Sequence, residues 1–553
     1  MFANLIEAIL AQLVEQRFCK AKVPGSSPGD GSRILSVKVC IMQYSKSPYF
    51  HVGRASELTG SDRILYRALE ILPGLLSWGT LLGVIVLSIF KPFYAAYFII
   101  AFDLYWLFKT IYLSVHLRHN WKRVKHNMKL DWRSMLSKFK YEHLTHMIIL
   151  PFYKEGLEVI EQSILSLVQS DYSPKKMIVV LAGEERAGLG AHELALQMKD
   201  KYANAFGHFL ITTHPKDVPG EMAGKGSNIS YAAEVARKEI LDVNKISYKD
   251  TIVSAFDIDT VVYPKYFSCL TWHFLTVPNP HKASFQPVPF YNNNIWQSPA
   301  VSRVVSMSST FWQMVQQERP EKLATFSSHS ISFQSLYEVG YWQKNMVSED
   351  SRIYWNMLMA NNGDYFVVPI SYPVSMDANL AKNFWQTLKN IYKQNRRWTW
   401  GVENVPYILF NFIKNKEIPL KRKVRTAFIQ IEGFWSLATN PIMIFLLGWL
   451  PVILGGKRFN ATILSYNLPV LTRDLMIVSM FGIVLSAMIS LSFLPPPPAN
   501  YKRVWLTKTF MLLQWALIPL TITIFGAIPG LEAQTRLMFG RYMGFWVTPK
   551  YRK

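Results

Sequence analysis

Four long stretches without any Asp, Glu, Lys or Arg constrain this chain more than any other feature. They are Ile71–Phe90, Phe434–Gly456, Leu475–Tyr501 and Thr509–Leu531. A helix needs roughly 20 apolar residues to cross the hydrocarbon core of a bilayer, and buried helices of soluble proteins are rarely that long. A further apolar segment at 93–115 is separated from the first stretch by Lys91-Pro92 and predicts a helical hairpin. The chain is therefore expected to be an integral membrane protein.

The net positive charge is concentrated beside these apolar stretches. The sequence has 553 residues, with 60 Lys or Arg against 37 Asp or Glu, so its formal net charge is +23. Basic clusters at 118–140 and 414–425 each adjoin an apolar segment, and basic flanks mark the cytoplasmic side of membrane proteins. We therefore predict membrane flanks rather than nucleic-acid binding or simple solvated surface. The residues between the clusters are then a cytoplasmic domain.

The N-terminal segment and the cysteines carry few signals. Residues 1–60 are predicted to be a disordered tail, because Pro and Gly interrupt the segment at 24–29 and no signal peptide is recognisable. The alternative is a true start at Met42. Cys19, Cys40 and Cys269 lie far apart and form no C-x-x-C pair, so neither a disulfide framework nor a thiolate zinc site is expected.

The proposed cytoplasmic domain alternates short apolar runs with helical patterns. Strands are predicted at 146–150, 177–182, 208–213 and 251–256, and helices at 156–170, 191–202 and 227–240. Such alternation implies an α/β domain with a mostly parallel sheet and with ligands bound at the carboxyl ends of the strands. Functional residues are therefore expected directly after strands.

Asp257-Ile258-Asp259 follows the last of these strands. Carboxylates at this spacing can reach one divalent cation, and hard oxygen ligands suit Mg²⁺ or Mn²⁺ that bridges a diphosphate. The triplet alone is a weak signal, because turns also favour aspartate. Its position at a strand end favours a metal site.

A second acidic pair occurs in Ser348-Glu349-Asp350, beside a predicted helix at 352–360. One interpretation is a helix N-cap, because Ser and Asp satisfy free backbone N–H groups. The other is a general base that deprotonates an acceptor hydroxyl group. Both interpretations stay open on this motif alone.

Two further motifs combine cations with helix-compatible sequence. Gln394-Asn395-Arg396-Arg397-Trp398 could bind a pyrophosphate and stack on a sugar, or could simply lie at the membrane interface. Lys225 lies in Gly224-Lys225-Gly226-Ser227-Asn228, which opens a helix and offers N–H groups to phosphates. It does not have the spacing of a Walker loop.

These motifs occur in the order and spacing of a known family. From about Leu144 to Lys553 the chain resembles the membrane-integrated, processive members of glycosyltransferase family 2, such as the catalytic subunits of cellulose synthase and hyaluronan synthase. The resemblance implies a GT-A fold, a Rossmann-like α/β domain inserted between N- and C-terminal transmembrane helices. The expected segments are a tail at 1–60, a transmembrane hairpin at 61–117, a basic cytoplasmic linker at 118–143, the GT-A domain at 144–400, an interfacial basic segment at 401–427, a transmembrane region at 428–531 and a gating-loop-like cytoplasmic tail at 532–553.

The resemblance also implies roles for the residues that match the family's motifs. Asp257 and Asp259 would hold Mg²⁺ or Mn²⁺, and Asp350 would be the catalytic base. The residues expected to bind the nucleotide sugar are Pro151, Tyr153, Glu155, Glu184, Lys225, Asp257, Gln394, Arg397, Thr548 and Lys550. Those expected to bind the acceptor are Trp398, Ser328, His329 and Glu349.

A C-terminal motif supports the resemblance, and three features depart from it. Phe545–Lys550 fits the F-x-V-T-x-K gating loop of cellulose synthase, which closes over the bound nucleotide. However, Gly183-Glu184-Glu185 replaces the usual acidic pair, which puts uracil-type contacts in question, and Phe326–Ser330 replaces the small-residue acceptor motif F-F-C-G-[ST]. The gating motif also has no spans after it. The acceptor pocket is therefore expected to differ in shape.

The position of this motif conflicts with a simple count of spans. Two N-terminal and three C-terminal crossings would place the tail outside the cell, where no nucleotide is available. We expect that Thr426–Leu454, which is broken at Asn440-Pro441, is interfacial or re-entrant. A missed crossing is the alternative.

The expected function is inverting, metal-dependent transfer of a hexosyl group from a nucleoside-diphosphate sugar, with UDP-sugars first, to a growing polysaccharide coupled to export. The catalytic domain would be cytoplasmic and the protein would lie in the plasma (inner) membrane. The expected partners are a glycan acceptor and the lipid bilayer, with an accessory export subunit left open and no nucleic acid. Alternatives are a non-processive enzyme with a lipid-linked acceptor, and a transporter or scaffold with a non-catalytic domain.

Overall fold

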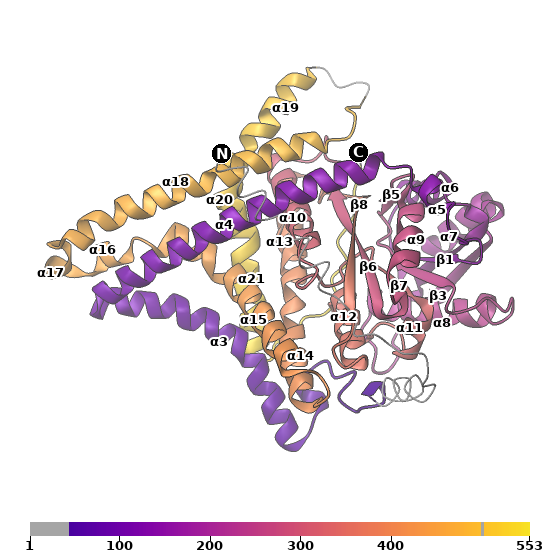
Figure 1. Cartoon of the computed structure of the whole chain (residues 1–553), viewed down its shortest axis with the longest axis horizontal. Helices are drawn as coiled ribbons and strands as arrows, with labels where there is room; N and C mark the ends of the chain where they lie inside the picture. Colours follow the sequence, from indigo (N-terminus) through magenta and orange to yellow (C-terminus); the bar gives the residue numbers. More distant parts are fainter. Residues whose placement is uncertain (1–43, 499–502, 553) are drawn as a thin grey trace.

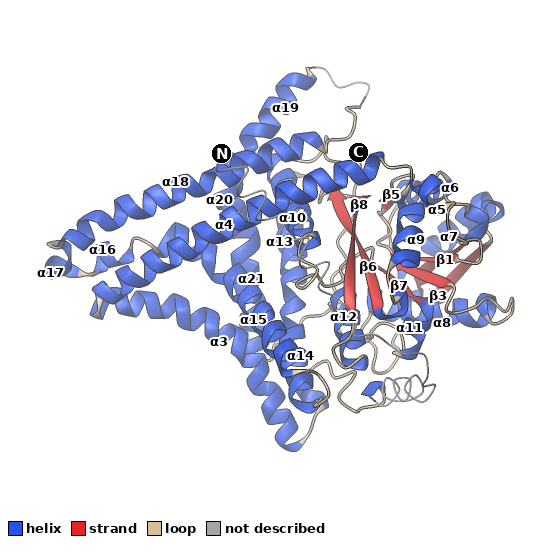
Figure 2. Ribbon diagram, viewed as in Figure 1, coloured by secondary structure: helices blue, strands red, loops and turns tan. Residues whose placement is uncertain are grey.

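The computed structural model describes residues 44–498 and 503–552 of the chain. An α/β domain lies at one end, and long helices extend away from it (Figure 1). The strands, red in Figure 2, gather in the α/β domain. The predicted tail over residues 1–43, with Met42, Cys19 and Cys40, lies outside the described residues.

A mixed sheet is the centre of the α/β domain, and within the described residues it has eight strands in the order β3-β2-β1-β4-β7-β6-β8-β5. The first four strands of this order are parallel, as are β6 and β8, whereas β7 and β5 are antiparallel to their neighbours. The strands are β1 (Thr145–Pro151), β2 (Met177–Glu184), β3 (His208–His214), β4 (Thr251–Ala255), β5 (Val261–Val262), β6 (Ala283–Tyr291), β7 (Ser330–Ser332) and β8 (Phe366–Met376). The predicted fold class, an α/β domain with a mostly parallel sheet between helical segments, is confirmed.

Helices cover both faces of the sheet, which explains why its parallel strands are apolar throughout. Met147 and Ile149 of β1 join one core, whereas Ile148 and Leu150 join the other. The first core is covered by α8 (Lys225–Ala236), α12 (Glu349–Ala360) and α14 (Asn404–Lys414), and the second by α6 (Leu157–Val168), α7 (Leu189–Tyr202) and α9 (Tyr266–Thr276). All four predicted strands and three predicted helices are present, with ends shifted by a few residues.

Residues 44–60 and α14 differ from the expected organisation, because tyrosines of these two segments form hydrogen bonds between them. Tyr44 Oη donates a hydrogen bond to Asn411 Oδ1 at 2.7 Å, and Tyr407 Oη donates one to Phe50 O at 2.9 Å. The prediction of a disordered tail is therefore wrong for residues 44–60. The same contacts make α14, which was assigned to an interfacial segment, a helix of the domain core.

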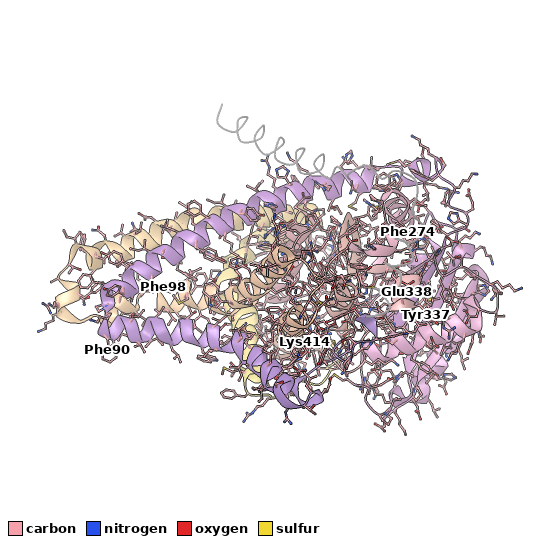
Figure 3. All side chains as sticks on the ribbon, turned by 60° about the horizontal axis from the view of Figure 1, so that its bottom comes forward. Phe90, Phe98, Phe274, Tyr337, Glu338 and Lys414 are labelled. Carbon is pink, nitrogen blue, oxygen red and sulfur yellow. The ribbon has the colours of Figure 1, made fainter. Side chains whose placement is uncertain are left out.

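The long helices form a bundle with an apolar core. α3 (Gly60–Phe90) and α4 (Pro92–Lys129) are the predicted hairpin, and α15 (Leu420–Ile442), α16 (Leu450–Leu454) and α18 (Ile463–Ser492) pack along it. The buried residues of this core are Leu81, Val84, Ala96, Ile99, Phe102, Met443, Ile444, Phe459 and Leu468. Figure 3 shows Phe90 and Phe98 at the far end of the bundle, opposite Phe274, Tyr337 and Glu338 in the α/β domain.

Four helical segments of the described chain are long and apolar enough to cross a membrane, namely Gly60–Phe90, Pro92–Lys129, Ile463–Ser492 and Val504–Met538. The last of these is divided into α19 (Val504–Leu513), α20 (Ile518–Ile522) and α21 (Ile528–Met538). A 3₁₀-helical turn at Gln514–Leu517 and a π-helical turn at Thr523–Ala527 join them. α20 packs on α10 (Ala300–Gln317), and α21 packs on α13 (Phe384–Thr399). This segment therefore lies against the domain.

Residues 426–454, which are expected to be interfacial or re-entrant, are not among these four candidate spans. α16 packs on both α3 and α4, and the Phe459 ring just beyond it lies 5.2 Å from the Phe93 ring at the turn of the hairpin. Pro441 does not end the helix, because the π-helical turn Met443–Leu447 follows it and accommodates the hydrogen bond that proline cannot make. The segment thus reaches the far end of the bundle.

Candidate active site

Two carboxylates follow β4 at the carboxyl end of the parallel strands. Asp257 Oδ1 accepts a hydrogen bond from Lys225 Nζ at 2.6 Å, and the same ammonium group donates to Asp350 Oδ2 at 2.9 Å. Asp350 is 125 positions from Lys225 in the sequence. The fold therefore joins the predicted metal-binding carboxylate to the predicted base through one lysine.

Lys225 begins α8, and the glycines on either side of it permit close packing. A Cβ atom on Gly226 would lie 2.8 Å from Gln343 O, and one on Gly224 would lie 2.7 Å from the Phe545 ring. Larger side chains at these two positions would push away the neighbouring loop and the C-terminal segment. The small residues of this motif thus allow both to approach the lysine.

The three charges stabilise one another. Burial alone would lower the pKa of Lys225, but the charges of Asp257 and Asp350 outweigh it and raise that pKa. Burial alone would raise the pKa of Asp257, yet Lys225 and Lys550 hold it below its ordinary value. Opposite charges in close contact favour the ionised forms, so the site holds an ammonium group between two carboxylates.

Asp259 is fully buried and is held by the C-terminal segment. Its Oδ2 accepts hydrogen bonds from Lys550 Nζ at 2.6 Å and from the backbone N–H of Asp377 at 2.9 Å. In the described part of the chain, its Oδ1 has no hydrogen-bond partner. The predicted gating motif therefore reaches the D-x-D carboxylates.

Asp377 is a buried carboxylate that was not predicted from the sequence. It directly follows β8, and Arg552 Nη2 lies 2.8 Å from its Oδ1. Burial, reinforced by the charge of Asp259, raises the pKa of Asp377. Recognition of β8 would have placed this residue at a strand end, which is where α/β proteins carry functional side chains.

Glu349 and Asp350 lie in the first turn of α12, and Ser348 at its N-cap makes no side-chain capping hydrogen bond, so the N-cap interpretation of this motif is wrong. Ser348 Oγ donates to Glu403 Oε1 at 2.6 Å. Burial and the charge of Asp350 raise the pKa of Glu349 to about 8, so this carboxyl group is protonated at neutral pH. Asp350 Oδ1 is buried and lacks a hydrogen-bond partner among the described residues, so one oxygen of the predicted base is unsatisfied.

Aromatic rings lie beside the carboxylates. Trp398 is 37% exposed, and its ring centroid is 5.8 Å from that of Tyr291 at the end of β6. Burial raises the pKa of Tyr291, and the charges of Asp257 and Asp259 add to this effect. These two rings therefore border the charged centre, and Trp398 is open to a ligand.

The other residues predicted to bind the acceptor are buried. Ser328, His329 and Glu349 are each at most 2% exposed. The Ser328 hydroxyl lies 3.3 Å from that of Thr260, and the backbone of Ser328 has a φ of 67°. His329 and Glu349 lie beside the base within the protein.

The predicted motif of α13 faces the C-terminal segment. Gln394 is buried, and its Oε1 accepts a hydrogen bond from Asn379 Nδ2 at 3.4 Å. The Arg397 guanidinium lies 5.0 Å from the centre of the Phe545 ring. Arg396 instead forms an ion pair with Glu532 of α21 at 2.8 Å. Neighbouring arginines of one motif thus contact different segments.

The residues expected near the nucleoside lie at the ends of β1 and β2. Pro151 ends β1, and the backbone N–H of Tyr153 donates to Glu155 Oε2 at 2.6 Å. Glu184 forms an ion pair with Arg186, whose guanidinium stacks over the Tyr153 ring at 4.7 Å. A cavity of about 400 Å³ adjoins this group. It is lined among others by Phe152, Glu184, Glu185, His192, Thr212 and Thr213.

Thr548 is buried near the end of the described chain. Its hydroxyl has no hydrogen-bond partner within residues 44–498 and 503–552. An unpaired buried hydroxyl is unfavourable. A ligand oxygen would remove that cost, which suits the predicted role of Thr548 on a diphosphate.

The D-x-D carboxylates fit a hard divalent cation as part of its coordination shell. Among the described residues, no group of three or more His, Cys, Asp or Glu could hold a metal ion. Asp257 and Asp259 hold the ammonium groups of Lys225 and Lys550, so this site already binds positive charge. Two carboxylates could therefore share a cation with diphosphate and water oxygens.

Comparisons with known proteins give one family and several distant structures. Residues 252–531, just over half of the chain, match the family model described as Glycosyl transferase family group 2. No curated protein matches the chain.

Three solved structures illustrate the distance of the structural likenesses. Mannosyltransferase PcManGT from Pyrobaculum calidifontis, in complex with GDP-Man and Mn²⁺, is 13% identical with a TM-score of 0.35, and the match covers 74% of this chain and 99% of that one. S. aureus TarS 1-349 is 10% identical with a TM-score of 0.33 and coverages of 63% and 91%. Its complex with UDP-GlcNAc is 12% identical with a TM-score of 0.29 and the same coverages. Likenesses this distant imply nothing about the substrate of this chain.

Proposed function

The chain belongs to the glycosyl transferase family group 2, and we propose that it transfers a hexosyl group from a nucleoside-diphosphate sugar to a growing glycan, with inversion at the anomeric carbon. The observation that supports this most directly is the link from Asp257 through Lys225 to Asp350. In this link, one lysine contacts both a candidate cation ligand and a candidate base. Membership of the family makes the chain a glycosyltransferase, and the donor, the stereochemistry and the acceptor belong to the proposal.

The donor would lie along the carboxyl ends of the strands. Its base would enter the cavity beside Tyr153, Glu155 and Glu184, with UDP-sugars the first candidates. Its diphosphate would lie near Asp257 and Asp259, where several cations and donors come together. We assign the diphosphate contacts to Lys225, Gln394, Arg397, Thr548 and Lys550. Positive charge and N–H donors at this place stabilise a departing diphosphate.

A divalent cation, Mg²⁺ or Mn²⁺, would be held by Asp257 and Asp259 and would neutralise charge on the leaving diphosphate. Lys550 must then leave Asp259, and its ammonium group would move to the phosphate oxygens. Lys225 would contact both the diphosphate and Asp350 and so fix the distance between them. Asp350 would take the proton of the acceptor hydroxyl as that oxygen attacks the anomeric carbon, while Trp398 stacks on the acceptor sugar.

Two acceptors remain candidates, each with its own observation. The motif Gln394–Trp398 favours a growing polysaccharide exported through the membrane. The apolar core of the helix bundle, with Leu81, Phe102 and Ile444, favours a lipid-linked acceptor, because a hydrophilic polymer needs a polar path. Product length separates the two. Long chains from one nucleotide sugar support the polysaccharide, and single transfer to extractable lipid supports the second candidate.

We propose that the α/β domain and the C-terminal segment face the cytoplasm of the plasma (inner) membrane. Two candidate spans precede the domain and two follow it, so the chain would return to the side of the domain, where Lys550 contacts Asp259. In a chain whose native cysteines are replaced by serine, Arg458→Cys at the far end should react with an impermeant thiol reagent in intact cells. A cysteine appended after Lys553 should react only after permeabilisation. Labelling of the appended cysteine from outside would overturn this topology.

The direct test of the reaction uses membranes that contain the wild-type chain. They are incubated with a panel of UDP-, GDP- and other nucleoside-diphosphate sugars, with Mg²⁺, Mn²⁺ or EDTA. We expect release of nucleoside diphosphate from one donor, and loss of that release in EDTA. Equal background with every donor and with Asp257→Asn would contradict the proposed function.

A further inference from the structure

Glu403 is a buried carboxylate just beyond the predicted motif of α13, and the proposed mechanism gives it no role. It is 6% exposed and ends the 3₁₀-helical turn Trp400–Glu403, which directly continues α13. Its Oε1 accepts hydrogen bonds from the backbone N–H of Val347 at 3.2 Å, and from the backbone N–H and the hydroxyl of Ser348 at 2.9 Å and 2.6 Å. Its Oε2 accepts one from Trp400 Nε1 at 2.9 Å. One side chain thus joins the end of α13 to the start of α12.

Asn404, the residue after Glu403, binds the same part of α12 further along the chain. Its Nδ2 donates a hydrogen bond to Ser351 Oγ at 2.9 Å, and its Oδ1 accepts one from Arg352 Nε at 2.6 Å. Asp350 lies between the residues that Glu403 holds and those that Asn404 holds. The main chain is therefore anchored on both sides of the proposed base.

The surroundings of Glu403 suit an ionised carboxylate. All four hydrogen bonds at its oxygens come from donors, and hydrogen bonds to a charged acceptor are stronger than those between neutral groups. Burial raises the pKa of Glu403, and the charge of Arg352 opposes this rise. Loss of the carboxylate would take the acceptor from two backbone N–H groups inside the protein, which is costly. The link between α13 and α12 is therefore strong.

The aromatic side of the site lies at the other end of this link. Trp398 is in the last turn of α13, two residues before Trp400, which is completely buried and donates to Glu403. The acceptor sugar is proposed to stack on Trp398 while its hydroxyl group gives a proton to Asp350. Transfer therefore requires a fixed distance between these two side chains. A displacement of about 1 Å in a reacting group can lower the rate by about a hundredfold.

We propose that Glu403 is a positioning residue that fixes the main chain of Asp350 relative to Trp398, so that the base and the acceptor platform keep one geometry. This inference rests on the proposed roles of Asp350 and Trp398. Lys225 contacts the side chain of Asp350 and relates it to the diphosphate of the donor. Glu403 acts on the backbone that leads into the base and relates it to the acceptor. The two contacts are therefore complementary.

Two substitutions of similar size separate hydrogen bonding from packing. Glu403→Met keeps most of the volume but removes both carboxylate oxygens, whereas Glu403→Gln keeps one oxygen for Ser348 and places an amide N–H opposite Trp400. We expect Glu403→Met to lower kcat by about tenfold to a hundredfold and Glu403→Gln to lower it less, with KM for the nucleotide sugar unchanged in both. Glu318→Met is the matched control, because Glu318 is a mostly buried carboxylate that accepts from Asn120 Nδ2 at 3.0 Å. It should leave kcat unchanged.

A double-mutant cycle with Asp350→Asn gives a readout that a general structural defect would not produce. If Glu403 acts through Asp350, Glu403→Met lowers the kcat of the wild type but causes no further loss of the residual kcat of Asp350→Asn. Equal losses in the two backgrounds would overturn the inference, as would equal kcat values for wild type, Glu403→Gln and Glu403→Met. Should Glu403→Met fail to fold, Glu403→Gln in the two backgrounds gives the same comparison with a smaller loss.

The same measurements distinguish failure of this inference from failure of the proposed function. Transfer by the wild type that falls in Asp350→Asn supports the proposed function, and the cycle then decides the role of Glu403. Additive losses in that cycle would refute the positioning role alone. Absence of nucleoside-diphosphate release by the wild type with every donor would refute the proposed function instead, and the positioning role with it.

Discussion

The helix bundle and the proposed catalytic centre both contain partly or fully buried charged side chains, but the hydrogen bonding of these side chains differs. In the bundle, Lys109 Nζ lies 2.5 Å from Glu432 Oε1, 2.8 Å from Ser436 Oγ and 3.0 Å from Tyr105 Oη. One ammonium group there has partners on two helices. A buried ion pair is tolerated when further hydrogen bonds satisfy it, so this cluster joins α4 to α15.

In the proposed catalytic centre, some charged oxygen atoms have no hydrogen-bond partner among the described residues. Asp257, Asp259 and Asp377 lie close together, and Asp259 Oδ1 and Asp350 Oδ1 are without hydrogen-bond partners among the described residues. The cations that neutralise them come from α8 and from the C-terminal segment. A divalent cation could replace these lysines at the carboxylates, and the lysines could then bind phosphate oxygens. We infer that the charged side chains of the bundle stabilise the folded state, whereas those of the proposed centre lower its stability and are suited to binding and reaction.

The largest expected effect concerns Asp350→Asn in the centre. Loss of the base should lower kcat by about a hundredfold or more, while the midpoint of thermal unfolding stays the same or rises. Nucleoside-diphosphate release measures the first quantity and a thermal melt in detergent the second. Asp364→Asn is the matched control, because Asp364 is 73% exposed and is paired with Lys282 at the surface. Near-normal transfer by Asp350→Asn would remove the base from the mechanism.

Lys550→Met should have the next largest effect. The substitution removes one cation from the proposed diphosphate site and leaves buried Asp259 without its ion pair. We expect transfer to fall by about tenfold to a hundredfold, measured as kcat/KM for the nucleotide sugar. Lys238→Met on the exposed surface of the domain should have no effect. Undiminished activity would mean that Lys550 only blocks the D-x-D site.

The sequence predicts the first half of this centre better than the second, and the reason is physical. β1 to β4 are continuous apolar runs, so Asp257 and Asp259 are visible at a strand end. β6 and β8 contain Pro287 and Pro369, residues that usually argue against a central strand. Their place in the sheet depends on pairing with distant segments, which overrides local preference.

Contacts between distant segments explain the remaining differences. Arg552 and Asp377 are 175 positions apart, and β7 and the helix Phe333–Glu338 lie between His329 and Trp342, so neither pair has a local signature. The same holds for Tyr44 and Phe50, whose partners on α14 lie far along the chain. The helical path beyond Pro441 likewise depends on packing against neighbouring helices, which the local sequence does not reveal. Local motifs identify the chemistry, and the fold decides which oxygen each donor reaches.

Glu432→Gln tests the other side of the comparison. The substitution leaves the partly buried ammonium group of Lys109 without its counter-charge, so the midpoint of thermal unfolding should fall by several degrees, the effect of breaking one partly buried ion pair. The kcat of the folded enzyme should not change. Arg473→Gln, which breaks the exposed pair with Asp474, should leave the midpoint unchanged. A loss of kcat without a loss of stability would show that the bundle takes part in the reaction.

The smallest expected effect is at Glu349, where the centre gives a pH-dependent stability. Burial, with the charge of Asp350, raises the pKa of Glu349 from 4.5 to about 8 in the folded chain. A group whose pKa is higher in the folded state binds its proton more tightly there, so its contribution is fully present below pH 4.5 and is lost as the pH rises toward 8. The unfolding midpoint of the wild type should therefore decline over this window.

Glu349→Gln replaces the protonated carboxyl group by an isosteric amide that cannot ionise. Its unfolding midpoint should decline less than that of the wild type between pH 4.5 and 8, and the difference between the two curves isolates Glu349 from the other buried carboxylates. At pH 7 the variant should keep its transfer activity within a few-fold, because the native side chain is already neutral there. A large loss of activity at pH 7, or parallel stability curves, would show that Glu349 is ionised in the folded enzyme. The charge next to Asp350 would then be doubled, and Lys225 alone would have to balance Asp257, Glu349 and Asp350.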